Sequence, residues 1–260
     1  MVVKTLPARA GLMWLRDALR LYRRQPFAFT SLVILYTIGV SMLAYVPFVG
    51  LPLAAVLIPF GTVGLTLAGR DAERGSIPMP VLMVQPFRDP QQRKALARLG
   101  LVNAGLVLLL VLLVSVLAAD ELANWKFVDG QLDPTSAGQN FPWDAIVAAA
   151  IAYLPILMVT WFAPQLVAWH GQPVGKALFF SFFACWRNRW PFLMLAAAIF
   201  ALSFGVIFVV TQLLQAFGAS PQLASMLFAP VALVLVSVGY ATQYPIYRSL
   251  IETPEPSSAT

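Results

Sequence analysis

One histidine and one cysteine, His170 and Cys185, are the residues of this chain best suited to acid–base, nucleophilic or metal chemistry. Hydrolysis needs a nucleophile with a base, or a metal with its ligands. No acidic residue lies near either side chain in the sequence, and there is neither a Gly-x-Ser-x-Gly turn nor a glycine-rich phosphate loop. We therefore expect no catalytic residue, no metal site and no cofactor. His170 is interpreted as a polar residue at a helix end and Cys185 as apolar filler.

Uncharged polar residues and prolines inside apolar stretches mark a second kind of site. No apolar stretch has Asp, Glu, Lys or His well inside it, which argues against a proton-coupled antiporter and a channel lined by charged rings. Asn103 and Gln165 are interpreted as hydrogen-bonding between helices, and Pro155, Pro164 and Pro230 as kinks. The alternative is a polar cavity near these five residues, as a permease for an uncharged or amphiphilic solute or lipid would need.

Two segments carry arginine and aromatic residues at helical spacing. In residues 8–24 the arginines share one helical face, with Trp14 on the other. In residues 174–190 an aromatic stripe lies opposite Ser181 and Asn188. Such helices typically lie flat among lipid headgroups, so we expect contacts with anionic lipid; the alternative is that they cap the end of a helix bundle. The candidate lipid-binding residues are Trp14, Arg16, Arg20, Arg23, Arg24, Trp186, Arg187, Arg189 and Trp190.

Long apolar stretches must position these residues. The chain is 60% hydrophobic and 11% charged, whereas soluble domains average about 45–50% apolar and about 25% charged. A spanning helix needs about 20 mostly apolar residues. Six windows qualify, at residues 27–46, 52–69, 96–118, 145–168, 191–213 and 223–247. The predicted fold class is an all-α polytopic membrane bundle of six transmembrane helices with cytoplasmic amphipathic helices.

The positive charges indicate how this bundle faces. Sixteen of the 17 lysines and arginines lie in residues 1–26, 70–98 and 170–190 or at Arg248, and the alternate connections hold only Lys126. By the positive-inside rule, both termini are predicted to be cytoplasmic in a bacterial inner membrane. The net charge of +6 then orients the chain and contacts anionic lipid, with no nucleic acid expected as a partner.

Short Pro- and Gly-containing turns at 46–52 and 214–222 indicate antiparallel neighbours, so we expect three hairpins in one transmembrane domain over 1–250, followed by a disordered cytoplasmic tail over 251–260. An amphipathic segment precedes both the first and the fifth window, and Phe-Ala-Pro occurs in the fourth and the sixth, which suggests a hairpin repeat.

The connection 70–95 has four prolines yet is too apolar for a free linker. It should dock on the bundle or dip into the interface.

Several motifs carry a family resemblance: Phe-Ala-Pro-Gln-Leu-Val-Ala-Trp-His-Gly at 162–171, Ala-Cys-Trp-Arg-Asn at 184–188, and Gly-Leu-Met-Trp-Leu-Arg at 11–16. On these the chain resembles a family of uncharacterised six-span membrane proteins of β-proteobacteria. That family is similar to the membrane part of some glycerophosphodiester phosphodiesterases. The resemblance covers nearly the whole chain and implies the six-span fold. It implies no catalytic residues, and phosphodiesterase activity is not expected from the spans alone.

These observations favour a non-catalytic inner-membrane protein that acts in bilayer organisation or as an accessory to another membrane protein. Its expected partners are anionic lipids, and a second membrane protein is a further candidate partner. The alternative function is the permease.

Overall fold

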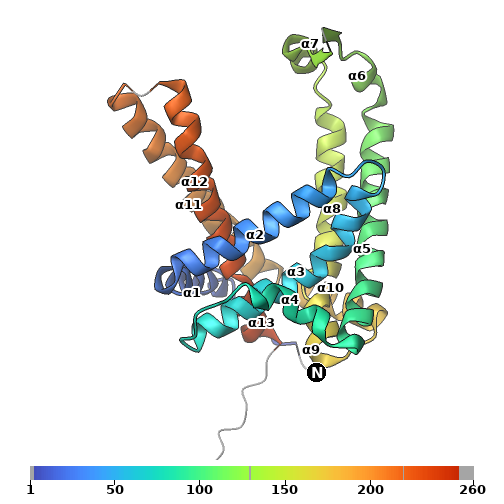
Figure 1. Ribbon diagram of the computed structural model, residues 1–260, viewed down its shortest axis with the longest axis vertical. Coiled ribbons are helices and arrows are strands. Elements are labelled where there is room, and N and C mark those ends of the chain that lie inside the picture. Colours follow the sequence, from blue (N-terminus) through green and yellow to red (C-terminus); the bar gives the residue numbers. More distant parts are fainter. Residues whose placement is uncertain (1–2, 129, 219, 252–260) are drawn as a thin grey trace, which may run out of the picture.

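The computed structural model describes residues 3–128, 130–218 and 220–251, which are almost entirely helical (Figure 1). The helices are α1 (Ala10–Arg24), α2 (Pro26–Ala44), α3 (Gly50–Glu73), α4 (Val81–Arg88), α5 (Pro90–Leu117), α6 (Ala119–Ala123), α7 (Pro134–Gln139), α8 (Trp143–Thr160), α9 (Ala163–His170), α10 (Val174–Arg187), α11 (Arg189–Ala216), α12 (Pro221–Ala241) and α13 (Gln243–Leu250). Strands β1 (Phe127–Val128) and β2 (Gln131–Leu132) form a small antiparallel pair.

Six stretches within the described residues are long and apolar enough to cross a membrane: Pro26–Ala44, Gly50–Glu73, Pro90–Leu117, Trp143–His170, Arg189–Ala216 and Met226–Leu250. They match the six predicted windows, so the all-α polytopic fold class is confirmed. The tail predicted over 251–260 lies outside the described residues except for Ile251, which is buried.

The chain is built as three copies of one pattern, a short amphipathic helix followed by a hairpin. The hairpins are α2–α3, α5–α8 and α11–α12, preceded by α1, α4 and α10. A single polar residue joins each short helix to its hairpin: Gln25, Asp89 and Asn188. The sequence predicted the first and third of these helices. It missed α4, which lies in the proline-rich connection 70–95.

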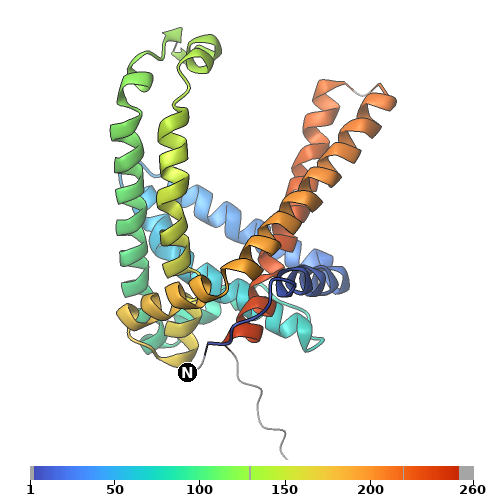
Figure 2. The same cartoon turned by 180° about the vertical axis from the view of Figure 1, so that it is seen from behind.

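The hairpins diverge from a common base (Figures 1 and 2). The hairpins α5–α8 and α11–α12 form two arms that point apart, and α2–α3 lies between them. The third predicted span, α5, crosses α3 closely at Gly100, where a Cβ atom would lie 2.2 Å from the carbonyl oxygen of Val56. The arms expose rows of apolar side chains, such as Phe200, Phe204 and Phe208 on α11. Lipid must cover these rows in the membrane.

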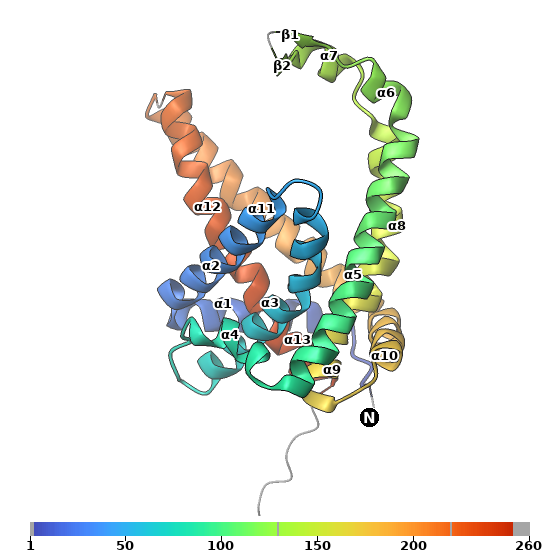
Figure 3. The same ribbon diagram turned by 45° about the vertical axis from the view of Figure 1, so that its right-hand side comes forward.

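The two ends of the molecule differ in charge. At the base, α1, α4, α9, α10 and α13 gather with the described ends of the chain, as Figure 3 shows. At the far end, α6, the β1–β2 pair and α7 cap the α5–α8 arm. The predicted outer loop 119–144 is therefore folded, and Asp133 caps α7 by accepting hydrogen bonds from the backbone of Thr135 and Ser136. Basic residues concentrate at the base, and acidic residues such as Asp120 and Glu121 lie at the far end.

The fourth span is two helices rather than one continuous helix over 145–168. The hydroxyl of Ser181 on α10 accepts a hydrogen bond from Phe162 N–H (2.9 Å) and donates one to Met158 O (2.7 Å). It thereby takes the place of the backbone hydrogen bond that would join those two groups. Pro164, in the first turn of α9, also lacks the N–H of a continuous helix.

The sixth span is interrupted as well, at Thr242, three residues before Pro245. The hydroxyl of Thr242 donates to Gly239 O (2.6 Å) at this break. The two Phe-Ala-Pro motifs are not equivalent in space, because Pro164 opens α9 whereas Pro230 lies inside the unbroken α12. The repeat therefore holds at the level of helices and not at these prolines.

Candidate basic face and polar cavity

The apolar side of α1 packs against the helix bundle. Trp14, Leu15, Ala18 and Leu21 are buried there. Trp14 is 2% exposed, lies 5.4 Å from the ring of Phe192, and donates through Nε1 to Ser249 Oγ at 2.8 Å. The prediction that Trp14 contacts lipid headgroups is therefore wrong. This side of α1 packs as the alternative predicted, as a helix that caps the end of the bundle.

The other side of α1 is exposed and basic. Arg16, Arg20, Arg23 and Arg24 lie along it, and together with neighbouring leucines they line a shallow groove of about 590 Å³. We call these four arginines the basic face. Leu12 and Met13, at the start of the same exposed side, are 50% and 58% exposed. The exposed surface thus combines apolar side chains with guanidinium groups, the combination that suits the boundary between acyl chains and headgroups.

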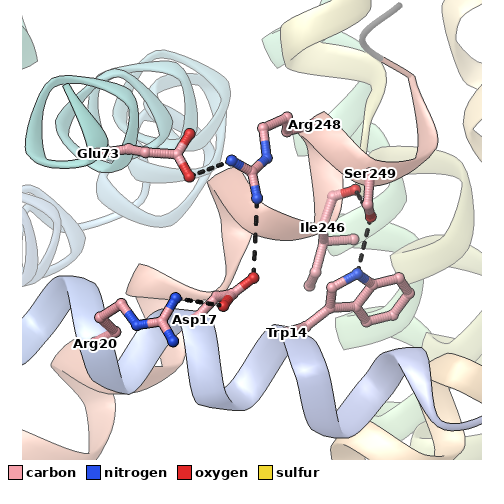
Figure 4. Close-up of polar contacts among 7 residues, drawn as sticks. All are labelled: Trp14, Asp17, Arg20, Glu73, Ile246, Arg248 and Ser249. Atoms are coloured by element: carbon pink, nitrogen blue, oxygen red, sulfur yellow. Dashed lines mark hydrogen bonds and ion pairs between the residues drawn. The ribbon is translucent and has the colours of Figure 1, made fainter. Parts of the chain in front are cut away.

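Carboxylates near the basic face are held by another arginine (Figure 4). Arg248 on α13 contacts both Glu73 of α3 and Asp17 of α1, the latter at 3.8 Å, and Asp17 lies 3.6 Å from Arg20. This network joins α1, α3 and α13 at the base. In the part of the chain that the structure describes, Arg16, Arg23 and Arg24 form no ion pair. Their charges are available to anionic groups outside the protein.

The aromatic stripe, which runs along α10 into the first turn of α11, is also largely exposed. Trp186 and Trp190 are 52% and 60% exposed, and the guanidinium of Arg189 lies 5.7 Å and 5.6 Å from their ring centroids. Arg187 is exposed as well. These four predicted lipid-binding residues therefore lie at the surface, where the cation–π contacts hold Arg189 between two amphipathic rings.

Asn188 fixes the junction of α10 and α11, a role that the sequence did not identify. Its Nδ2 donates to Lys4 O (3.0 Å) and Ala184 O (2.9 Å), and its Oδ1 accepts from Leu6 N (2.9 Å). It is fully buried. The signal was present as a polar residue opposite the aromatic stripe. Asn188 therefore ties the segment before α1 to the end of α10.

A cavity of about 240 Å³ lies where the three hairpins meet, and we call it the polar cavity for the hydroxyl and amide groups on its otherwise apolar wall. Its polar wall includes Tyr36, Asn103, Tyr153, Thr160, Tyr240 and Gln243, from α2, α5, α8, α12 and α13. Of the five predicted cavity residues, Asn103 and Pro164 line it. Pro155 and Pro230 lie inside α8 and α12 but do not line the cavity; the α12 residue that does, Tyr240, is ten residues beyond Pro230. Asn103 donates to Ala55 O at 2.8 Å, as expected for a contact between helices.

Gln165, the fifth predicted residue, lies behind this wall in a buried polar cluster. Its Nε2 donates to Thr66 Oγ1 at 3.0 Å, and Thr66 Oγ1 lies 3.1 Å from Gln243 Oε1. The cluster links α9, α3 and α13 and holds the Gln243 side chain at the cavity wall. Gln165 Oε1 has no hydrogen-bond partner among the described residues.

The amides and prolines that suggested a cavity in the sequence did not point to its three tyrosines, Tyr36, Tyr153 and Tyr240. Tyr36 and Tyr240 contact each other edge to face, with ring centroids 5.7 Å apart. Tyrosine in membrane proteins is concentrated at the interfaces. Tyr36 and Tyr153, well inside predicted spans, were therefore the signal that could have located the cavity.

His170 ends α9, as expected, and its Nε2 lies 2.7 Å from the hydroxyl of Tyr247. Trp169 packs edge to face on Tyr247 and takes the guanidinium of Arg70 over its ring at 5.8 Å. Within the described residues, no three of His, Cys, Asp and Glu are grouped so that they could hold a metal ion. This cluster stabilises the contact between α9 and α13.

Comparison with known proteins identifies a relative among membrane proteins. A probable inner membrane protein of Burkholderia thailandensis is 35% identical over 262 residues, which cover 96% of this chain and 94% of the relative. No family model matches the chain. No solved structure matches it either.

Proposed function

Because this chain belongs to the same family as the probable inner membrane protein of Burkholderia thailandensis and has six candidate spans, we propose that it is a non-catalytic inner-membrane protein that binds anionic lipid at its base. Through this binding it would organise the surrounding bilayer or serve as an accessory to another membrane protein. The observation that carries the proposal is the basic face of α1, which is exposed while the opposite side of the helix is fixed in the bundle.

The distribution of charge supports this proposal. The base holds most of the positive charge, and from the positive-inside rule we infer that this end, with both termini, faces the cytoplasm. The cytoplasmic leaflet has a negative surface potential, and each lysine or arginine near it contributes about 1 kcal/mol. The family resemblance to membrane parts of glycerophosphodiester phosphodiesterases fits a membrane module of this kind and adds no activity.

The test replaces Arg16, Arg23 and Arg24, the three arginines of the basic face that form no ion pair among the described residues, with glutamine in the full-length protein. The protein is placed in nanodiscs of phosphatidylethanolamine and phosphatidylglycerol, and retained lipid is measured by native mass spectrometry at rising salt. Removing three arginines should cost about 3 kcal/mol of binding free energy. We therefore expect the variant to retain phosphatidylglycerol about a hundredfold more weakly.

The matched control is the triple lysine variant at the same positions, which keeps the charge and is expected to retain most of the lipid. Retention of phosphatidylglycerol that is the same in the glutamine variant and insensitive to salt would refute the proposal.

A second candidate function, a permease or carrier for an uncharged or amphiphilic molecule, is favoured by the polar cavity where the hairpins meet. Residues of all three hairpins line the cavity, and substrate sites of transporters built from repeats lie where the repeats meet. Its supporting observation is independent of the basic face, so the two functions can be tested separately.

A further inference from the structure

The polar cavity offers hydrogen bonds without charge. The described residues that line it include three tyrosines, two carboxamides and two threonines, and none of them is charged. Asn103 Nδ2 donates one hydrogen to Ala55 O, which leaves its carbonyl oxygen and its second amide hydrogen for a ligand. Gln243, whose Oε1 contacts Thr66, can offer its amide hydrogens. The wall therefore presents both donors and acceptors to an uncharged partner.

An apolar groove of about 170 Å³ lies beside the cavity, between α2, α3 and α4. Gly39, Leu57, Phe60 and Met83 are among its lining residues. Tyr36 lines both the groove and the cavity. The polar cavity and the apolar groove thus meet at one side chain. This arrangement suits a molecule whose polar head lies in the cavity and whose apolar chain lies in the groove.

The position of Tyr36 depends on a glycine. A Cβ atom at Gly61 would lie 2.0 Å from Cε2 of Tyr36, so the ring rests directly on the backbone of α3. On its other side the ring contacts Tyr240. The aromatic ring is thus fixed between two helices, at the boundary of the two spaces.

From these observations we propose that the cavity and the groove together bind one membrane lipid with an uncharged, hydroxyl-rich headgroup, such as a glycosyl diacylglycerol. This inference rests on the second candidate function and names its ligand class. Burying a phosphate in a cavity without a cation is costly, which excludes anionic headgroups here. The cavity volume equals that of about eight water molecules at about 30 Å³ each, enough for one sugar-sized group. The aromatic rings of the wall can stack on the apolar C–H face of a sugar, and its hydroxyls can hydrogen-bond to the sugar hydroxyls.

The test uses the full-length protein in nanodiscs of phosphatidylethanolamine with equal minor amounts of glucosyl diacylglycerol and phosphatidylglycerol. Native mass spectrometry measures which lipid stays bound. The variant Tyr36→Phe/Tyr240→Phe keeps both rings and removes only the hydroxyls. We expect its affinity for glucosyl diacylglycerol to fall about tenfold for each hydrogen bond that is lost. Retention of phosphatidylglycerol should not change.

The matched control is Tyr45→Phe, at the exposed turn after α2, which should behave as wild type. The variant Gly61→Ala must displace the Tyr36 ring. Like the double variant, it should therefore lose glucosyl diacylglycerol. Equal retention of glucosyl diacylglycerol by wild type and the double variant would overturn the inference. So would an affinity for free glucose equal to that for the glucosyl lipid, because the groove would then contribute nothing.

Failure of this inference differs visibly from failure of the first proposal. Retention of phosphatidylglycerol that depends on the arginines, together with glucosyl-lipid retention that ignores the tyrosines, would leave the basic face intact and remove only the cavity ligand. The opposite pattern would remove the anionic-lipid proposal and keep the cavity.

Discussion

Cys185 illustrates how burial decides the chemistry of a single residue. It lies in α10, outside the spanning segments, and burial raises the pKa of its thiol from 9.0 to about 12. The thiolate is the reactive form of cysteine, so the folded protein holds this residue in its inert form. The interpretation of Cys185 as apolar filler agrees with its packing.

We expect Cys185 to react slowly with N-ethylmaleimide at neutral pH in the folded protein and rapidly after unfolding. The raised pKa means that the folded state binds the thiol proton more tightly than the unfolded chain. Its contribution to stability is full below pH 9 and is lost as the pH rises from 9 toward 12. Labelling kinetics and thermal unfolding at several pH values measure both effects. Fast labelling of the folded protein at neutral pH would contradict this account.

Single residues of the candidate sites were predictable where charge or hydropathy marked them. The arginines of α1 stood out by their spacing, and the structure places them on one exposed side. The sequence could not show that Trp14 turns inward, because a tryptophan suits a lipid interface and a bundle interior equally. It also could not show that Tyr36, Tyr153 and Tyr240, from three hairpins, meet at one cavity.

At the scale of elements, helices were predictable and their interruptions were not. Hydropathy located all six spans because it is a local property. The break between α8 and α9 depends on Ser181, a residue of another helix, which no local pattern reveals. The helix α4 was missed because its prolines argued against it, although Pro80 precedes its first residue and Pro90 begins the next helix.

The close crossing of α3 and α5 makes a prediction for two glycines of one helix. Gly100→Ala should lower the free energy of unfolding by about 1–3 kcal/mol, because its Cβ would collide with the backbone oxygen of Val56. Gly105→Ala is the control, since a Cβ there meets nothing within 4 Å. Thermal unfolding in detergent compares the two. Equal stability of both variants would show that the helices do not cross this closely.

At the scale of the whole molecule, three repeated units diverge from a base that joins them. The spans other than α3 bury few side chains within the protein, so most of their surface must face lipid. The divergence of the arms was not predictable from the sequence. In lipid, no hydrophobic force distinguishes a helix face that packs against another helix from one that faces lipid. The segregation of charge between base and far end was predictable from the loops alone.

The proposed lipid binding requires that the base, with its basic face, lie at the cytoplasmic leaflet. The test places one cysteine in a chain that carries Cys185→Ala, either at Ser76, in the connection at the base, or at Thr135 of α7, at the far end. Cells are then treated with a membrane-impermeant maleimide. We expect the Thr135 position to react in cells whose outer membrane alone is opened, and the Ser76 position to react only after the inner membrane is opened. The reverse pattern would put the arginines on the outer surface and contradict the proposed lipid binding.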